Sequence, residues 1–225
     1  MVRLVLFDID GTLVHSGGAG VKAFGHACHS EFGVAEGAAR IKFAGRTDVS
    51  LVREFFVGHG FEPSPENFQR FFESYLGWLR RTLPESQGGP CAGVLEFMAA
   101  LETLPEPPVI GLLTGNIRRG AQLKLEHYGL WHKFPFGGFA DDHEDRDQIA
   151  VAAHRRGSDH FQRPLNGNEV LVIGDTPFDI RCGRAIQARV LAVATGGATL
   201  EQLQAHQPNW AVRDLREITA SAACA

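Results

Sequence analysis

The sequence contains no long hydrophobic run and no cysteine spacing typical of disulfides or metal sites. Its four cysteines form no CxxC pair, so we expect neither a disulfide framework nor a zinc site. No apolar run approaches the ~20 residues that span a bilayer. The apolar run at the N-terminus ends after Phe7 in two acids, which is not the pattern of a signal peptide. We therefore expect a cytoplasmic protein without a membrane partner.

The sequence also lacks a large net charge of either sign. The 225 residues carry a net charge of −4, and 21% of them are charged. This is the composition of an ordinary globular protein, and it gives no electrostatic reason to expect a nucleic-acid partner. No segment has the composition of a dedicated interface, so the sequence leaves open whether the protein is a monomer or a homodimer.

Short apolar runs predict buried strands of a parallel sheet. Three are clear and two weaker: Val2–Phe7, Val109–Leu113 and Val170–Ile173, then Phe136–Ala140 and Arg189–Ala194. Helix-length segments lie between or after them: Gly93–Leu104, Ile117–Tyr128, Asp147–Arg156, Phe178–Gln187 and Thr199–His206. Strands that alternate with helices predict an α/β fold, a doubly wound, Rossmann-like parallel sheet.

The region from Val14 to Glu85 interrupts this alternation. It shows no clear strand and predicts three helices, Gly20–Phe32, Asp48–His59 and Pro65–Leu83. Its many aromatic residues predict a hydrophobic core of its own. A turn-rich segment, Gln87-Gly88-Gly89-Pro90, follows it as a candidate hinge. We predict a core of residues 1–13 and 86–225, with an α-helical domain of residues 14–85 inserted after the first strand.

Carboxylates follow two of the predicted strands. Asp8 and Asp10 come after the first strand, and Asp175 and Asp179 come after Val170–Ile173. Ligands bind at the carboxyl ends of parallel strands, so neighbouring strands would bring these four acids together. Their repulsion would be relieved by a hard divalent cation, and oxygen ligands suit Mg²⁺. Each acid could alone serve a turn or a helix start, but their recurrence after two strands favours a site.

A hydroxyl and a glycine follow the strand Val109–Leu113 in the segment Thr114-Gly115-Asn116. A helix is predicted to begin directly afterwards, so backbone N–H groups and the Thr114 hydroxyl are available to an oxyanion. The same three residues are also common in simple turns. Combined with the acids, they predict a phosphate-binding pocket that includes Thr114, Gly115 and Asn116.

These motifs resemble those of the haloacid dehalogenase-like superfamily of hydrolases. Its first, second and fourth motifs match three segments of this sequence: Asp8-Ile9-Asp10-Gly11-Thr12, Thr114-Gly115-Asn116 and Gly174-Asp175-Thr176-Pro177-Phe178-Asp179. The resemblance covers the whole chain, because members with an α-helical cap carry that cap after the first strand. It implies that Asp8 attacks phosphorus and forms an aspartyl-phosphate. Asp10 then protonates the leaving group and activates water.

The resemblance also implies the ligands of the cofactor Mg²⁺. They are Asp8, the backbone carbonyl of Asp10 and Asp175, with Asp179 beside them. Thr114 and the N–H of Gly115 would hold the phosphoryl oxygens.

The third motif departs from the family's pattern. Most relatives place a lysine before a helix between the second and fourth motifs, but residues 134–174 contain none. Arg146 is the best substitute, because it precedes a predicted helix and its planar fork binds phosphate at two points. The acids around Arg146 also allow a solvated charge run. Lys133 is an alternative, although it lies early in the sequence.

Three residues of the predicted cap region are candidates for contact with the substrate. Arg46, between Gly45 and Thr47, resembles the cap loop that relatives lower onto the substrate, where it would meet a second anionic group. A surface arginine near a helix start is the alternative. His15 and Ser16, at the junction with the core, would contact the leaving group or serve as hinge residues.

The function that these resemblances imply is a Mg²⁺-dependent phosphatase. Helical caps close over small molecules and exclude water, so we expect a small phosphorylated metabolite as substrate and a phosphoglycolate phosphatase-like activity. A phosphomutase of the β-phosphoglucomutase type would use the same residues and need a bisphosphate primer. A haloacid dehalogenase is disfavoured, because it needs neither Asp10 as an acid nor the metal ligands. A degenerate, non-catalytic binding protein is disfavoured by the complete set of acids.

Overall fold

The predicted apolar runs form neighbouring strands of one parallel sheet. The computed structural model describes residues 1–225. Its main sheet has six strands in the order β5-β4-β1-β6-β7-β8, and every adjacent pair is parallel. The strands are β1 (Leu4–Phe7), β4 (Val109–Leu113), β5 (Gly137–Gly138), β6 (Val170–Gly174), β7 (Arg189–Val193) and β8 (Trp210–Val212).

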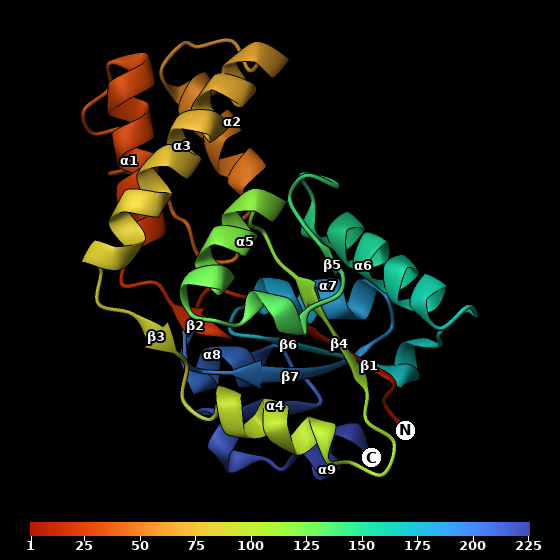
Figure 1. Cartoon of the computed structure of the whole chain (residues 1–225). Coiled ribbons are helices and arrows are strands. Elements are labelled where there is room, and N and C mark those ends of the chain that lie inside the picture. The colour runs from red at the N-terminus through yellow and green to blue at the C-terminus, as the bar shows by residue number, and fades with distance from the viewer.

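Helices cover both faces of this sheet (Figure 1). Leu4 and Leu6 of β1 pack with residues of α6, α7 and α8 on one face. Val5 and Phe7 pack with residues of α4, α5 and α9 on the other. These helices are α4 (Val94–Glu102), α5 (Arg118–His127), α6 (Arg146–His160), α7 (Pro177–Ala185), α8 (Leu200–Ala205) and α9 (Ala220–Cys224). The sheet with a helical layer on each face confirms the predicted α/β fold.

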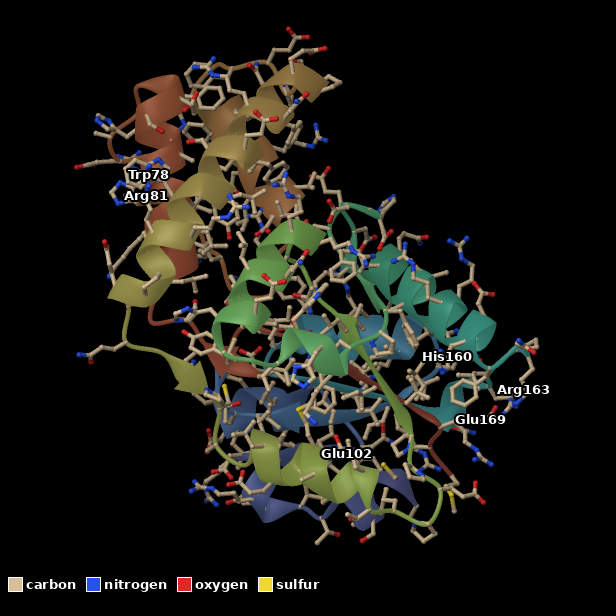
Figure 2. All side chains as sticks on the ribbon, viewed as in Figure 1. Trp78, Arg81, Glu102, His160, Arg163 and Glu169 are labelled. Carbon is tan, nitrogen blue, oxygen red and sulfur yellow. The ribbon has the colours of Figure 1, made fainter.

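Three further helices stand apart from the sheet (Figure 1). They are α1 (Ala19–Phe32), α2 (Asp48–Gly58) and α3 (Pro65–Glu85). Their buried residues form a separate hydrophobic cluster, in which the rings of Phe24 and Phe71 lie 4.8 Å apart. Trp78 and Arg81 lie on the outer side of this helical group, with the guanidinium 5.1 Å from the centre of the Trp78 ring (Figure 2). We call α1–α3 and their connecting loops the cap; its exact boundaries stay a prediction.

The prediction that residues 14–85 contain no strand is wrong in one detail. Val14–His15 forms β2, which pairs antiparallel with β3 (Gly89–Pro90). Two residues are too few to show an alternation in the sequence, so this ribbon had no detectable pattern. It joins the two connections between the cap and the sheet, at the turn-rich segment predicted to be a hinge.

Other differences concern the ends of elements. Helix α6 begins at Arg146, one residue before the predicted start, because the Asp145 side chain caps it by accepting a hydrogen bond from Asp147 N at 3.0 Å. The helix ends at His160, beyond the predicted end at Arg156. Strand β8 and helix α9 are short and were not predicted. The four cysteines are free and buried. None of the helices is both long and apolar enough to cross a membrane.

Candidate active site

The loops after three adjacent strands meet at one end of the sheet. In the register of the sheet, Phe7 at the end of β1 is level with Leu112 of β4 and Ile173 of β6. Asp8 donates its backbone N–H to the Ile173 carbonyl at 2.9 Å, which fixes the start of the first loop. Because β1 lies between β4 and β6, Asp8 is placed between the loops that carry Thr114 and Asp175. The sequence predicted a shared site only if these strands were neighbours, and they are.

Three buried carboxylates form an acidic group at this point. Oxygens of Asp8, Asp175 and Asp179 all lie within 4.8 Å of one another. Burial raises the pKa of Asp8 well above its ordinary value, and the charges of Asp179 and Asp175 add to this effect. Burial and the neighbouring Asp179 also raise the pKa of Asp175 to about 7. The charged state of this group is therefore costly unless a cation shares it.

The acidic group fits a hard divalent cation. Its donors are carboxylate oxygens only, which is the set that Mg²⁺ and similar ions prefer. Hydrogen bonds orient two of the three acids. Asp175 accepts from Gly197 N at 2.9 Å, and Asp179 accepts from the Thr176 backbone N–H at 2.9 Å and hydroxyl at 2.7 Å. Such supporting contacts fix ligands in one orientation.

Two glycines leave room for Asp175. A Cβ on Gly196 would lie 1.7 Å from the Asp175 Oδ2 atom, which is far inside van der Waals contact. Gly11 has a φ of +83°, and a Cβ there would lie 2.7 Å from the same oxygen. The backbone can approach this carboxylate only because both positions lack a side chain.

Arg146 lies where the sequence analysis placed the missing cation. It is the first residue of α6, its side chain is only 4% exposed, and its Nη2 atom lies 3.5 Å from Asp8 Oδ1. The same nitrogen forms an ion pair with Asp179. Although burial lowers the pKa of Arg146, the Asp179 and Asp8 carboxylates outweigh burial and raise it. Nη1 of Arg146 makes no hydrogen bond to the protein, whereas its Nε atom is buried without a hydrogen-bond partner.

The alternative cation, Lys133, does not contribute to the site. It ion-pairs with Glu102 at 2.8 Å, and that glutamate lies on the far side of the molecule from the cap (Figure 2).

Asp10 does not join the acidic group through its carboxylate. That carboxylate contacts Lys124 Nζ at 2.6 and 2.8 Å and accepts from Asn116 Nδ2 at 2.8 Å. Burial raises the pKa of Asp10, but the charge and hydrogen bonds of Lys124 and Asn116 outweigh burial and lower it. The backbone carbonyl of Asp10 accepts no hydrogen bond. This leaves it free for the ligand role that the family resemblance implies.

Lys124 is the main site residue that sequence reasoning missed. Its side chain is 5% exposed, and its Nζ atom also donates to Asn116 Oδ1 at 2.6 Å. Asn116 in turn donates to Thr114 Oγ1 at 2.8 Å, so Lys124 connects Asp10 to the segment after β4. A signal was present in the sequence, because Lys124 occupies the buried stripe of α5 together with Gly120, Ala121 and Leu125.

The cap closes directly over the segment after β4. The Asp48 backbone N–H donates to the Gly115 carbonyl at 2.7 Å, and Ile117 N donates to the Asp48 carboxylate at 2.8 Å. A Cβ on Gly115 would lie 2.2 Å from the Arg46 carbonyl oxygen, so only glycine permits this approach. Arg46 lines the space between cap and core, but its guanidinium is ion-paired with Glu54 of the cap and donates to the Ser50 carbonyl at 3.3 Å.

A cavity of about 440 Å³ joins these groups. This volume suits a small organic phosphate. Most predicted site residues line it: Asp8, Asp10, His15, Ser16, Arg46, Thr114, Gly115, Asn116, Arg146 and Asp175. Asp179 lies behind them, 1% exposed, against Arg146. The structure therefore brings the predicted residues together, with Arg46 at the cavity but already paired.

The family model of the haloacid dehalogenase-like hydrolases matches residues 5–193. The chain belongs to this family. The predicted family is thereby confirmed, and the prediction of a phosphatase-type hydrolase is confirmed at the level of the family.

Similar proteins cover almost the whole chain. A protein of Clostridium perfringens, provisionally named pyrophosphatase PpaX, is 24% identical over 228 residues, which cover 97% of this chain and 96% of that protein. IndB of Dickeya dadantii, provisionally named a phosphatase, is 26% identical and covers 99% and 94%. The crystal structure of a predicted phosphoglycolate phosphatase from Haemophilus somnus has a TM-score of 0.73 at 17% identity, with 96% of each chain covered. At this identity the structural match shows the shared fold.

Proposed function

We propose that the protein is a Mg²⁺-dependent phosphatase that hydrolyses a small phosphomonoester through a phosphoryl group on Asp8. The observation that carries this proposal is the position of Asp8. It is the one carboxylate that belongs to the acidic group, lines the cavity and lies beside Arg146. A nucleophile for phosphorus needs this combination, because its own charge and that of the substrate must both be neutralised.

The residues around Asp8 would hold the phosphoryl group in line with it. Arg146 would offer its Nη1 donor to the phosphoryl oxygens. The Thr114 oxygen accepts hydrogen bonds from Asn116, so the hydrogen of its hydroxyl is available to a phosphoryl oxygen as well. Asp8, Asp175 and Asp179, with the Asp10 carbonyl, would hold Mg²⁺, which supplies positive charge between the nucleophile and the phosphate. Electrostatic preorganisation of this kind is the main source of rate in phosphoryl transfer.

Asp10 would serve as the acid and base. Lys124 and Asn116 hold its carboxylate outside the acidic group and on the cavity, where its side chain is 43% exposed. From this position it protonates the departing oxygen and later removes a proton from the water that attacks phosphorus. Arg46 would bind a second anionic group of a substrate only by exchanging its ion pair with Glu54. The cytoplasmic location and the monomeric or dimeric state stay predictions, whereas the preference for phosphoglycolate that the family resemblance implies is not part of this proposal.

Phosphate release from p-nitrophenyl phosphate tests the proposal. Mg²⁺ is expected to support turnover, and its removal by EDTA to lower kcat by at least ~100-fold, because three carboxylates are left without their cation. Mg²⁺ is also expected to raise the unfolding midpoint, since saturation at 100 times Kd stabilises the fold by about 2.7 kcal/mol. Equal rates with and without the ion would contradict the proposal. Little phosphate release, together with isomerisation of a sugar phosphate only in the presence of a bisphosphate primer, would indicate the phosphomutase. No turnover of any kind would indicate the non-catalytic alternative.

The Lys124→Met variant tests the support of Asp10. Methionine keeps most of the side-chain volume but removes the charge that holds the Asp10 carboxylate in place. We expect kcat to fall by roughly 10- to 100-fold, since a positioned acid and base contributes 10²–10⁴-fold. The unfolding free energy should fall by about 1–3 kcal/mol, because the buried Asn116 Oδ1 atom loses its donor, whereas water can reach the partly exposed Asp10 carboxylate. Lys133→Met, which removes a surface ion pair, is the matched control and should retain wild-type kcat.

A further inference from the structure

The part of the cavity beneath the cap offers two polar atoms without a protein partner. Tyr75 of α3 lines the cavity. Only 4% of this residue is exposed, yet its hydroxyl makes no hydrogen bond. Asp48 lines the cavity as well. Its Oδ2 atom accepts from Ile117 N at 2.8 Å, whereas its Oδ1 atom accepts no hydrogen bond. A largely enclosed hydroxyl and carboxylate oxygen gain free energy when a ligand supplies their missing partners.

No unpaired arginine or lysine accompanies these two groups. Lys124 is held by Asp10 and Asn116. Arg46 is ion-paired with Glu54. Arg146 lies at the acidic group, where it would meet the phosphate. Every arginine or lysine that lines the cavity therefore already has an anionic partner.

Asp48 makes this region negative at neutral pH. Burial raises the pKa of Asp48 to about 6, and the charge of Lys124 limits the rise. The carboxylate is therefore mostly ionised near pH 7, in a space that Phe24 and Leu51 shield from bulk water on the cap side. A second carboxylate brought into this space would lose hydration and meet a like charge without a compensating cation.

We propose that Tyr75 and Asp48 determine specificity for phosphate esters whose leaving group is a neutral, hydroxylated molecule. One hydroxyl of the leaving group donates to Asp48 Oδ1, and another oxygen accepts from the Tyr75 hydroxyl. Esters with a carboxylate on the leaving group, phosphoglycolate among them, are rejected by the charge of Asp48. This inference rests on the proposed phosphatase function and names the substrate class of the same site.

Two three-carbon esters isolate the effect of charge. Glycerol 3-phosphate and 3-phosphoglycerate differ mainly in a hydroxymethyl group in place of a carboxylate. We expect kcat/KM for glycerol 3-phosphate to exceed that for 3-phosphoglycerate at least ~10-fold, because sites built around hydrogen bonds discriminate strongly against mismatched polar groups. Phosphoglycolate should also be a poorer substrate than glycerol 3-phosphate.

Two variants test the assigned residues. Tyr75→Phe removes only the hydroxyl, and kcat/KM should fall ~10-fold more for glycerol 3-phosphate than for p-nitrophenyl phosphate, whose leaving group has no hydroxyl to bind. Asp48→Asn removes the charge but keeps an oxygen that can accept from Ile117 N. It should therefore reduce the preference for glycerol 3-phosphate over 3-phosphoglycerate at least ~10-fold. Tyr128→Phe is the matched control, because the Tyr128 hydroxyl donates to the His15 carbonyl at 3.2 Å and does not line the cavity.

The outcomes separate this inference from the function on which it rests. If p-nitrophenyl phosphate is hydrolysed but 3-phosphoglycerate or phosphoglycolate is used as well as glycerol 3-phosphate, the inference is wrong and the phosphatase function stands. The inference is also overturned if both variants keep the wild-type ratio of kcat/KM values. If no ester is hydrolysed, the aryl phosphate included, the proposed function is wrong and the inference fails with it.

Discussion

Replacing Asp8 by asparagine is expected to abolish turnover, with a loss on the order of 10⁴-fold or more in kcat, because removal of a nucleophile leaves only binding and electrostatic contributions. Asparagine has nearly the same shape, so the cavity and the strand register should persist. The metal-free Asp8→Asn protein should unfold at the same temperature as wild type or higher. The substitution removes a buried charge whose pKa is raised by burial and by Asp179 and Asp175.

The two readouts together distinguish a catalytic role from a structural one. A variant that lost activity because it misfolded would unfold at a lower temperature, whereas Asp8→Asn should lose activity without losing stability. Asp159→Asn is the matched control, since Asp159 is exposed near the end of α6 and should be replaceable without effect. Retention of more than a tenth of wild-type kcat by Asp8→Asn would remove the basis for the proposed mechanism.

The second large effect is expected at Arg146. Arg146→Ala should lower kcat by about 10²–10⁴-fold, because it removes the only cation of the chain that contacts the nucleophile and would contact the phosphate. It also leaves Asp8 and Asp179, 8% and 1% exposed, without their ion pair. Breaking a buried pair from one side costs about 3–5 kcal/mol, so the unfolding free energy should fall as well. Mg²⁺ should restore part of this stability but not the activity.

Lysine at the same position separates charge from geometry. Arg146→Lys keeps the charge and matches the residue that most relatives place in their third motif, so it should recover activity relative to Arg146→Ala. Lys133→Ala should have wild-type kcat, since it loses only a surface ion pair worth about 0–1 kcal/mol. Equal activity of wild type and Arg146→Ala would show that another group neutralises Asp8.

Much of the site could be predicted because it depends on the topology of the sheet. Continuous apolar runs predicted β1, β4 and β6, and residues at the carboxyl ends of adjacent parallel strands must lie close together. The convergence of Asp8, Thr114 and Asp175 follows from that rule. Arg146 was found by the same logic, as a cation directly before a helix that packs beside the sheet.

The contacts that could not be predicted depend on the length and conformation of side chains, and the order of the strands does not determine them. Lys124 is 114 residues from Asp10 in the sequence, and it reaches Asp10 from the second turn of α5. The pattern of buried residues along α5 indicates that Lys124 is buried, but it does not indicate that Asp10 is its partner. The pairing of Arg46 with Glu54 depends on side-chain conformations within one loop and helix, so the expectation of a free arginine over the substrate had no structural constraint behind it.

The contacts between the cap and the core could not be predicted from the sequence either. The sequence predicts that Gly115 belongs to a phosphate-binding segment, but its contact with the Arg46 carbonyl depends on how the cap docks on the core. The docking also brings Asp48 and Tyr75 to the cavity, and the sequence alone gave no reason to associate either residue with the substrate. The proposed specificity therefore depends on contacts of the cap, whereas the proposed chemistry depends on residues that the sheet positions.

The most direct test of the account is the detection of the phosphorylated enzyme. Wild-type protein turning over p-nitrophenyl phosphate with Mg²⁺ is quenched in acid within milliseconds, digested, and analysed by mass spectrometry. We expect a hydroxylamine-sensitive phosphoryl group on Asp8 in the peptide that spans β1. A phosphoryl group on another residue, or none on the enzyme during a pre-steady-state burst of p-nitrophenol, would contradict it.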